Sequence, residues 1–427
     1  MKKIKEAKTE AILILSGLLN IKKPFKIPKS FKSFKTHINF TDSGMDATAF
    51  LENFFSPQFL ANALPLNDKN IFYKGVNSYT KTINSPYTFQ HIGISHTVKI
   101  VYLDLFTFSN DTMIYAIKFD LSNLPLEIIP IFNKKIRGFD IEKNSVLADL
   151  FFMLNNCSKV SKSNISNTSD YFHLVVNGNI LKSYLMLSEN FEYTEDYGRK
   201  ELLLDLATVS KIGTASKKSN TKDQFAPNYA DQLLNENLIS IYKNWTAVTI
   251  YDSFVYIQEK DERGLNVFQW EYLYFRFIYI NSFFVKNYLS EINTEFRKEK
   301  YNKQLTDTFI QFDKTYNLQK ISFNFLPNLI YKNLNKGFQI EKEMEQLHLA
   351  IENENIKNER QENQRLNNVL LVITLFTLIS VLKDWFDWLA DYIRFEGIIL
   401  YSITLSPFVI ILIIIVIYML KHREKSI

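Results

Sequence analysis

The sequence predicts an α/β domain, built on a mixed sheet with flanking helices, that leads into a long stalk helix and a C-terminal transmembrane hairpin of two helices. Three observations support this fold class. Runs rich in Val, Ile, Tyr, Phe and Thr alternate with polar connections between residues 90 and 260. A helical pattern without Pro or Gly begins after Gly337, and two uncharged stretches of bilayer length follow it.

The first predicted segment, residues 1–36, is strongly basic. It carries ten Lys against two Glu, a balance of 10 − 2 = +8, whereas the formal net charge of the whole chain is +5. Lys26, Lys29 and Lys32 alternate there with Phe and Pro, a pattern that suits an anionic ligand or anionic lipid. The alternative is a solvated, partly extended arm. Within this segment, residues 11–19 fit a short amphipathic helix better than a secretory signal, because Glu6 and Glu10 interrupt the pattern and no small-x-small cleavage site follows.

Residues 37–336 form the predicted α/β sensor domain, placed in the cytoplasm. Strands are expected at 96–108, 113–121, 171–176, 180–187, 202–209 and 247–258. Polar runs at 161–170 and 211–223 are the clearest loops. Aromatic helical patterns follow at 268–302 and 309–331, with Pro327 marking a break or kink.

Several kinds of chemistry are excluded or disfavoured by composition. The 11 Gly residues are spread too far apart for G-x-G-x-x-G or a phosphate-binding P-loop. The one Cys, Cys157, forms neither an internal disulfide nor a Cys-rich zinc site, which suits a reducing cytoplasm. The six His are scattered, so metal ligands stay unassigned. Carboxylates cluster near Arg199 without a nucleophile or metal triad, and we therefore expect no catalytic residue and no enzyme activity.

The stalk is predicted at residues 337–365. Ile340, Met344, Leu347 and Ile351 recur at alternating steps of four and three, which is the spacing of a heptad seam. The pattern then turns polar through residues 352–365, which are rich in Glu, Asn and Gln. The seam is therefore expected either to open around water or to pack through amides.

The membrane hairpin consists of spans at 366–382 and 397–420, joined by an acidic outer loop at 383–396. The spans have 17 and 24 uncharged residues, or ~26 Å and ~36 Å of helix. Trp385 and Trp388 suit the membrane interface, and the basic tail at 421–427 and the Arg residues before the first span indicate the cytoplasmic side. We expect a two-span protein of the inner (plasma) membrane with both termini in the cytoplasm.

Polar residues of the first span fall mainly on one stripe of the helix, with steps of four and three. The stripe comprises Asn363, Asn367, Leu370, Thr374, Thr377, Val381 and Asp384. A stripe of amides and hydroxyls on an oligomerising helix can line a pore, and an acidic residue at its outer end would attract cations. The alternative is hydrogen bonding between helices in a closed bundle.

This order of domains resembles the CorA family of magnesium and divalent-cation channels over the whole chain. The resemblance implies a homopentamer whose first span lines the pore. That family carries a Gly-Met-Asn triplet at the outer end of this span, whereas residues 380–388 here read Ser-Val-Leu-Lys-Asp-Trp-Phe-Asp-Trp. In lacking this triplet, the sequence is similar to divergent CorA-like proteins found beside type III CRISPR systems. The resemblance implies a membrane effector switched by a nucleotide second messenger, such as adenylated S-adenosylmethionine.

The expected function is therefore a ligand-gated oligomeric cation channel with an antiviral role. A divalent cation and a small anionic nucleotide are its expected non-covalent ligands, the lipid bilayer and further copies of the chain its partners. No covalent cofactor and no direct nucleic-acid partner are expected. Two alternatives stay open, namely a divergent housekeeping divalent-cation transporter and a membrane-anchored binding or signalling protein without a pore.

Overall fold

A computed structural model describes most of the α/β domain and one long helix. The described residues are 10–19, 27–33, 54–63, 76–108, 112–138, 145–157, 182–189, 193–216, 224–251, 253–259, 271–298, 303–392 and 406. The chain divides into two compact units, Met1–His348 and Leu349–Ile427. The expected strand at 171–176, the loop at 161–170 and the second span at 397–420, apart from Ser406, lie outside the described residues.

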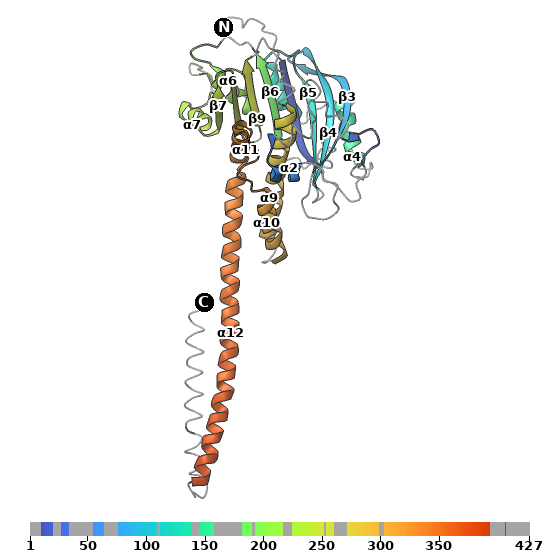
Figure 1. Cartoon of the computed structure of the whole chain (residues 1–427). Helices are drawn as coiled ribbons and strands as arrows, with labels where there is room; N and C mark the ends of the chain where they lie inside the picture. Colours follow the sequence, from blue (N-terminus) through green and yellow to red (C-terminus); the bar gives the residue numbers. More distant parts are fainter. Residues whose placement is uncertain are drawn as a thin grey trace. The chain divides into compact units, whose positions relative to one another are not determined.

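The described strands of the first unit form one mixed sheet of nine strands in the order β2-β3-β4-β5-β1-β6-β9-β8-β7 (Figure 1). The strands are β1 (Glu10–Leu19), β2 (Lys32–Ser33), β3 (Val76–His91), β4 (Ile94–Phe108), β5 (Met113–Asp120), β6 (Lys182–Glu189), β7 (Leu238–Tyr242), β8 (Trp245–Ile250) and β9 (Ser253–Glu259). Only the β6–β9 pair is parallel among the pairings of these strands. The expected mixed sheet is thus confirmed, together with its strands at β4, β5 and β6.

The predicted N-terminal amphipathic helix is wrong. Residues 10–19 form β1, which pairs antiparallel with β5 on one side and with β6 on the other. Its apolar run Ala-Ile-Leu-Ile-Leu is buried throughout. Because helices cover both faces of the sheet, a central strand here has no polar face. A short run of this kind cannot be distinguished from a helix by its periodicity alone.

Two other predicted strands differ from the structure. Residues 202–209 were expected as a strand, but the chain forms α6 (Arg199–Ala207), whose first turn is capped where the Glu201 carboxylate accepts the Gly198 backbone N–H at 2.9 Å. The helix is buried nearly all round, so its sequence lacks an amphipathic pattern. The expected strand at 247–258 is the β8–β9 hairpin, which turns at Tyr251 with φ of 39°.

Helices lie on both faces of the sheet (Figure 1). They are α2 (Pro57–Ala63), α3 (Ile128–Arg137), α4 (Val146–Cys157), α6, α7 (Pro227–Asn237), the π-helix η4 (Glu271–Tyr279), α9 (Ile280–Lys298), α10 (Lys303–Tyr316) and α11 (Phe325–Gly337). On one face, Phe132 of α3 packs against Phe89 and Phe119 of the sheet. On the other face, Phe275 of η4 packs against Phe106 and Tyr184.

The predicted aromatic helices are present but divided differently. The region expected as one helix at 309–331 contains α10 and α11, and Pro327 lies in the first turn of α11, where a missing N–H has no consequence. The C-terminal end of α11 packs closely on β8, since a Cβ on Gly337 would lie 2.3 Å from the Thr249 methyl carbon. Glycine is therefore required at this crossing.

The long helix after Gly337 is confirmed as α12 (Ile340–Tyr392), which runs without a break through the predicted stalk and first span. It also includes the first ten residues of the expected outer loop. In the first unit Ile340, Met344 and Leu347 are buried within a single chain. These seam residues therefore pack inside the protomer.

Candidate functional site

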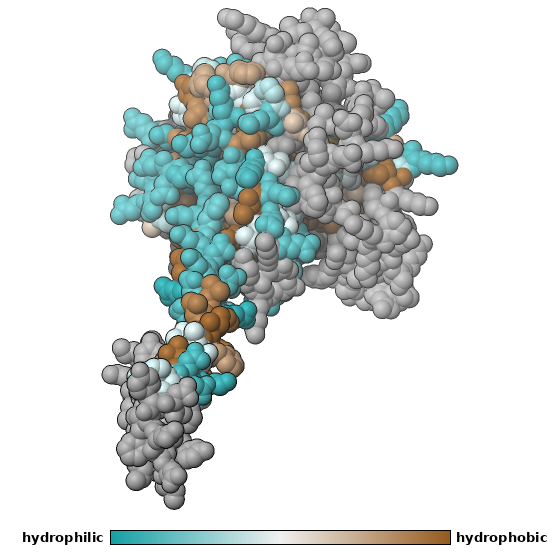
Figure 2. Space-filling model, turned by 60° about the horizontal axis from the view of Figure 1, so that its bottom comes forward, coloured by the Kyte–Doolittle hydropathy of each residue, from teal (hydrophilic) through white to brown (hydrophobic). Residues whose placement is uncertain are grey.

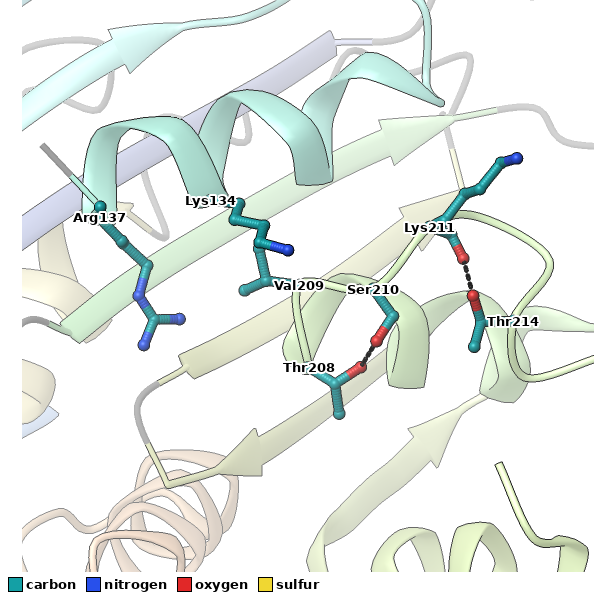
Figure 3. Close-up of a pocket in the computed structure, with 8 residues that line it drawn as sticks. Lys134, Arg137, Thr208, Val209, Ser210, Lys211 and Thr214 are labelled. Carbon is teal, nitrogen blue, oxygen red and sulfur yellow. Dashed lines mark hydrogen bonds between the residues drawn. The ribbon is translucent and has the colours of Figure 1, made fainter. Parts of the chain in front are cut away.

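A cavity of about 800 Å³ opens on the α3 face of the sheet, between the C-terminal turn of α3 and the loop that follows α6 (Figure 3). Among the described residues, its lining comes from these two segments: Lys134, Arg137, Gly138, Thr208, Val209, Ser210, Lys211 and Thr214. Three of them are cationic and none carries a carboxylate. The cavity therefore attracts anions.

Two of the three cations are lysines without an ion-pair partner in the described part of the chain. Among the described residues, no carboxylate forms an ion pair with Lys134 or Lys211, and both side chains are exposed. Figure 3 shows Lys134 extending from α3 toward Val209 and Ser210 of the loop. Lys211 follows Ser210 directly in the same loop, so the cations of the cavity come from two separate segments.

Arg137 is anchored at the sheet. Its Nη1 donates to the Ser253 hydroxyl of β9 at 3.3 Å, and that hydroxyl lies 3.1 Å from the Ser183 hydroxyl of β6. Both serines are buried at the start of the parallel strand pair. The contact orients the guanidinium, whose planar fork matches phosphate or carboxylate oxygens.

The hydroxyls of the cavity present oxygen acceptors. Thr208 donates its hydroxyl proton to the Leu204 carbonyl at 2.7 Å, and Ser210 lies 2.8 Å from the Thr208 oxygen, positioned to donate to it. Thr214 donates to the Lys211 carbonyl at 2.6 Å (Figure 3). Since these protons are used within the protein, the hydroxyl oxygens are left with lone pairs for donor groups of a ligand.

A buried carboxylate, Asp205 on α6, holds the loop in place. It accepts the Gly213 N–H at 2.7 Å, the Ala215 N–H at 2.9 Å and the Tyr197 hydroxyl at 2.8 Å. Burial raises the pKa of Asp205 to about 6, although these hydrogen bonds favour the charged form. Burial, reinforced by the Asp205 charge, also raises the pKa of the Tyr197 hydroxyl, which stays a donor.

Strained backbone occurs at the same loop. Val209 has φ of 57°, in the left-handed region that β-branched residues rarely adopt, and Gly213 has φ of 95°. Strain of about 1–3 kcal/mol at a non-glycine residue is a frequent mark of functional loops. Here it places Val209 on the cavity wall and allows Ser210 to turn back toward Thr208.

The lysines predicted to bind an anion do not line this cavity. Lys29 and Lys32 are exposed, and Lys32 lies in β2 opposite Thr80, while Lys26 lies outside the described residues. Phe31 between them is buried in the core, so this stretch is fixed to the sheet edge. Their role in ligand binding stays a prediction.

The sequence contains a signal for the cavity. Lys134, Lys135 and Arg137 crowd the last turn of α3, and a Thr-Val-Ser-Lys stretch follows the leucine run of α6. Because residues 202–209 are predicted as a strand, the helix end from which the loop begins is not identified from the sequence.

Along α12 the predicted pore stripe is exposed from end to end. Asn363, Asn367, Leu370, Thr374, Thr377, Val381 and Asp384 are all solvent-exposed, Leu370 by 58% and Val381 by 61%. A neighbouring stripe of Leu371, Leu375, Leu378 and Leu382 is half-buried. Apart from that leucine stripe, the described residues of the span are exposed, and the polar stripe is one part of this exposed surface.

The threonines of the stripe bond to their own helix. Thr374 donates to the Leu370 carbonyl at 2.7 Å and Thr377 to the Ile373 carbonyl at 2.6 Å. Their oxygens consequently offer lone pairs outward. A ring of such oxygens favours cations over anions.

One helix of the described residues is long and apolar enough to cross a membrane, the part of α12 from Ile340 to Trp385, and its most apolar window is not buried at all. In Figure 2, by contrast, the visible described surface of the α/β unit is mainly hydrophilic. Length and composition are the basis for regarding α12 as a membrane-spanning helix.

Metal-ligating side chains are not clustered in the described part of the chain. No group of three His, Cys, Asp or Glu there is placed to hold a metal ion. Arg199, near which carboxylates cluster in the sequence, forms an ion pair with Glu259 and donates to the Lys243 carbonyl. This arginine joins α6 to the end of β9.

Comparison with known protein families and with curated proteins finds no match to this chain.

Proposed function

We propose that this protein is an oligomeric membrane cation channel that is opened by an anionic, nucleotide-type ligand bound to its α/β unit. The observation that carries the proposal is the exposed stripe on α12, in which outward hydroxyl oxygens alternate with apolar side chains and end at Asp384. In lipid the amides and the carboxylate of such a stripe require protein or water as neighbours, and several copies facing inward provide both.

The remaining features extend the proposal. Residues 397–420 would supply the second span. The protein would lie in the inner (plasma) membrane with both termini in the cytoplasm. The resemblance to CorA-like channels supports five copies around the pore, and the branch beside type III CRISPR systems supports an antiviral effector. The missing Gly-Met-Asn triplet disfavours ordinary magnesium uptake.

The experiment compares two adjacent leucines in liposomes that contain the full-length protein and a potassium-sensitive dye. Leu370→Asn places an amide on the stripe, wets an apolar ring and should give a cation leak without any ligand. Leu371→Asn makes the same chemical change on the half-buried leucine stripe, so it should reduce stability without opening a path. Equal leak from the two variants would refute the pore assignment.

A membrane-anchored binding protein without a pore is the second candidate. It is favoured by the same hydrogen bonds, because threonine hydroxyls that bond to their own helix can also face lipid. Native mass spectrometry in a mild detergent separates the two, since an anchored monomer would contradict the channel.

A further inference from the structure

We propose that the cavity between α3 and the loop after α6 binds a phosphate-bearing small molecule of nucleotide size. The proposal rests on the anionic-ligand part of the function above, but not on conduction. It also moves the ligand site from the predicted lysines of the N-terminal segment to Lys134, Arg137 and Lys211.

Charge is the first argument. The three cations are donors without acceptor capacity, so a ligand must bring acceptor oxygens to them. No carboxylate is among the described residues that line the cavity, and neither Lys134 nor Lys211 forms an ion pair within the described part of the chain. A phosphate monoester brings a charge of roughly −1.5 to −2 with three strong acceptor oxygens. Arg137, already oriented by Ser253, provides the fork that phosphate oxygens fit.

The second argument concerns the rest of the ligand. The oxygens of Thr208, Ser210 and Thr214 have acceptor lone pairs because their protons are donated within the protein. Such acceptors suit the hydroxyls of a sugar or the amino group of a base. The volume of about 800 Å³ lies in the range of small-molecule sites, roughly 300–1,000 Å³, and greatly exceeds a phosphate ion.

A simpler explanation covers only part of the arrangement. Basic residues in the last turn of a helix stabilise its negative dipole end, and Lys134 and Arg137 occupy the last turn of α3. Lys211 lies on a different segment, four positions beyond the last residue of α6, so it is not part of a last helical turn. The loop that carries it is also held by Asp205 in a strained form, as expected of a preformed site.

The test is isothermal titration calorimetry on the full-length protein in detergent, with four probes: ATP, AMP, adenosine and inorganic phosphate. ATP and AMP should bind, adenosine should not, and phosphate should bind about tenfold more weakly than AMP or worse, because it leaves the hydroxyl oxygens unused. Binding by phosphate as tight as by AMP would mean a simple anion site and would overturn the nucleotide class.

Variants locate the site. Lys134→Glu and Lys211→Glu should each weaken ATP binding by about tenfold or more, because each removes a charge-assisted contact and adds repulsion. Lys332→Glu on α11, an exposed lysine elsewhere with the same charge change, should leave affinity unchanged. Thermal melting verifies that every variant folds.

Two results would overturn the proposal. One is the absence of ATP and AMP binding to folded protein, and the other is a loss of binding in Lys29→Glu and Lys32→Glu but not in the cavity variants. Because calorimetry needs no ion flux, nucleotide binding without any liposome conductance would refute the channel and leave this site standing.

Discussion

The carboxylate of Asp205 should make folding stability depend on pH in a direction opposite to that of ordinary carboxylates. Its pKa is raised from the usual 3.8 to about 6. The folded state therefore binds a proton more tightly than the unfolded state does. The stabilisation that results is fully present below pH 4 and is lost as pH rises through 6. A shift of about two units corresponds to a loss of about 3 kcal/mol over this window.

The measurement compares wild type with Asp205→Asn by urea unfolding in detergent, followed by tryptophan fluorescence at pH 4 to 7. An amide does not titrate, and subtraction removes the contributions of the other carboxylates. Its NH2 group would also face an N–H of Gly213 or Ala215, which costs about 1–3 kcal/mol at every pH. The advantage of wild type over the variant should therefore shrink by about 3 kcal/mol from pH 4 to pH 7. A difference that is flat, or that grows with pH, would refute the reasoning.

The other predictions concern the pore mouth and the crossing of α11 with β8. Asp384→Lys in a Leu370→Asn background should lower cation current in liposomes, since it reverses the charge at the outer end of the stripe; an unchanged current would remove Asp384 from the mouth. Gly337→Ala should destabilise the α/β unit by about 1–3 kcal/mol in urea unfolding, because its methyl group would meet the Thr249 side chain. Thr249→Ser should restore part of that loss, and failure of this rescue would show that the close contact is not the cause.

Periodicity explains which elements the sequence could predict. Residues 94–108 and 113–120 contain long runs of β-branched and aromatic residues, and the fifty-three residues of α12 include no Pro or Gly, so these assignments are confirmed. The apolar runs of β1 and α6 are short and buried all round, which removes the periodic signal that separates strand from helix. The packing of these two segments in the fold determines that one is a strand and the other a helix.

The polar stripe can be predicted from the sequence, whereas the cavity cannot. All seven stripe residues lie on one helix, so their common face follows from spacing alone. The cavity lies between the end of α3 and a loop about seventy positions later in the sequence. The two segments meet because both pack on the same face of the sheet. No spacing rule relates Lys134 to Lys211, and only the fold does.

The central place of β1 has a consequence for how the protein is made and handled. This strand precedes the other described strands in the sequence, yet both of its edges stay open until β5 and then β6, ending at Glu189, have emerged from the ribosome. During that interval the run Ala-Ile-Leu-Ile-Leu is exposed. Lysines precede it in the sequence, and charged residues beside an apolar strand oppose aggregation. Deleting residues 1–36 would remove the middle strand of the sheet along with the basic charge. The role of those lysines can therefore be examined only by point substitution in the intact chain.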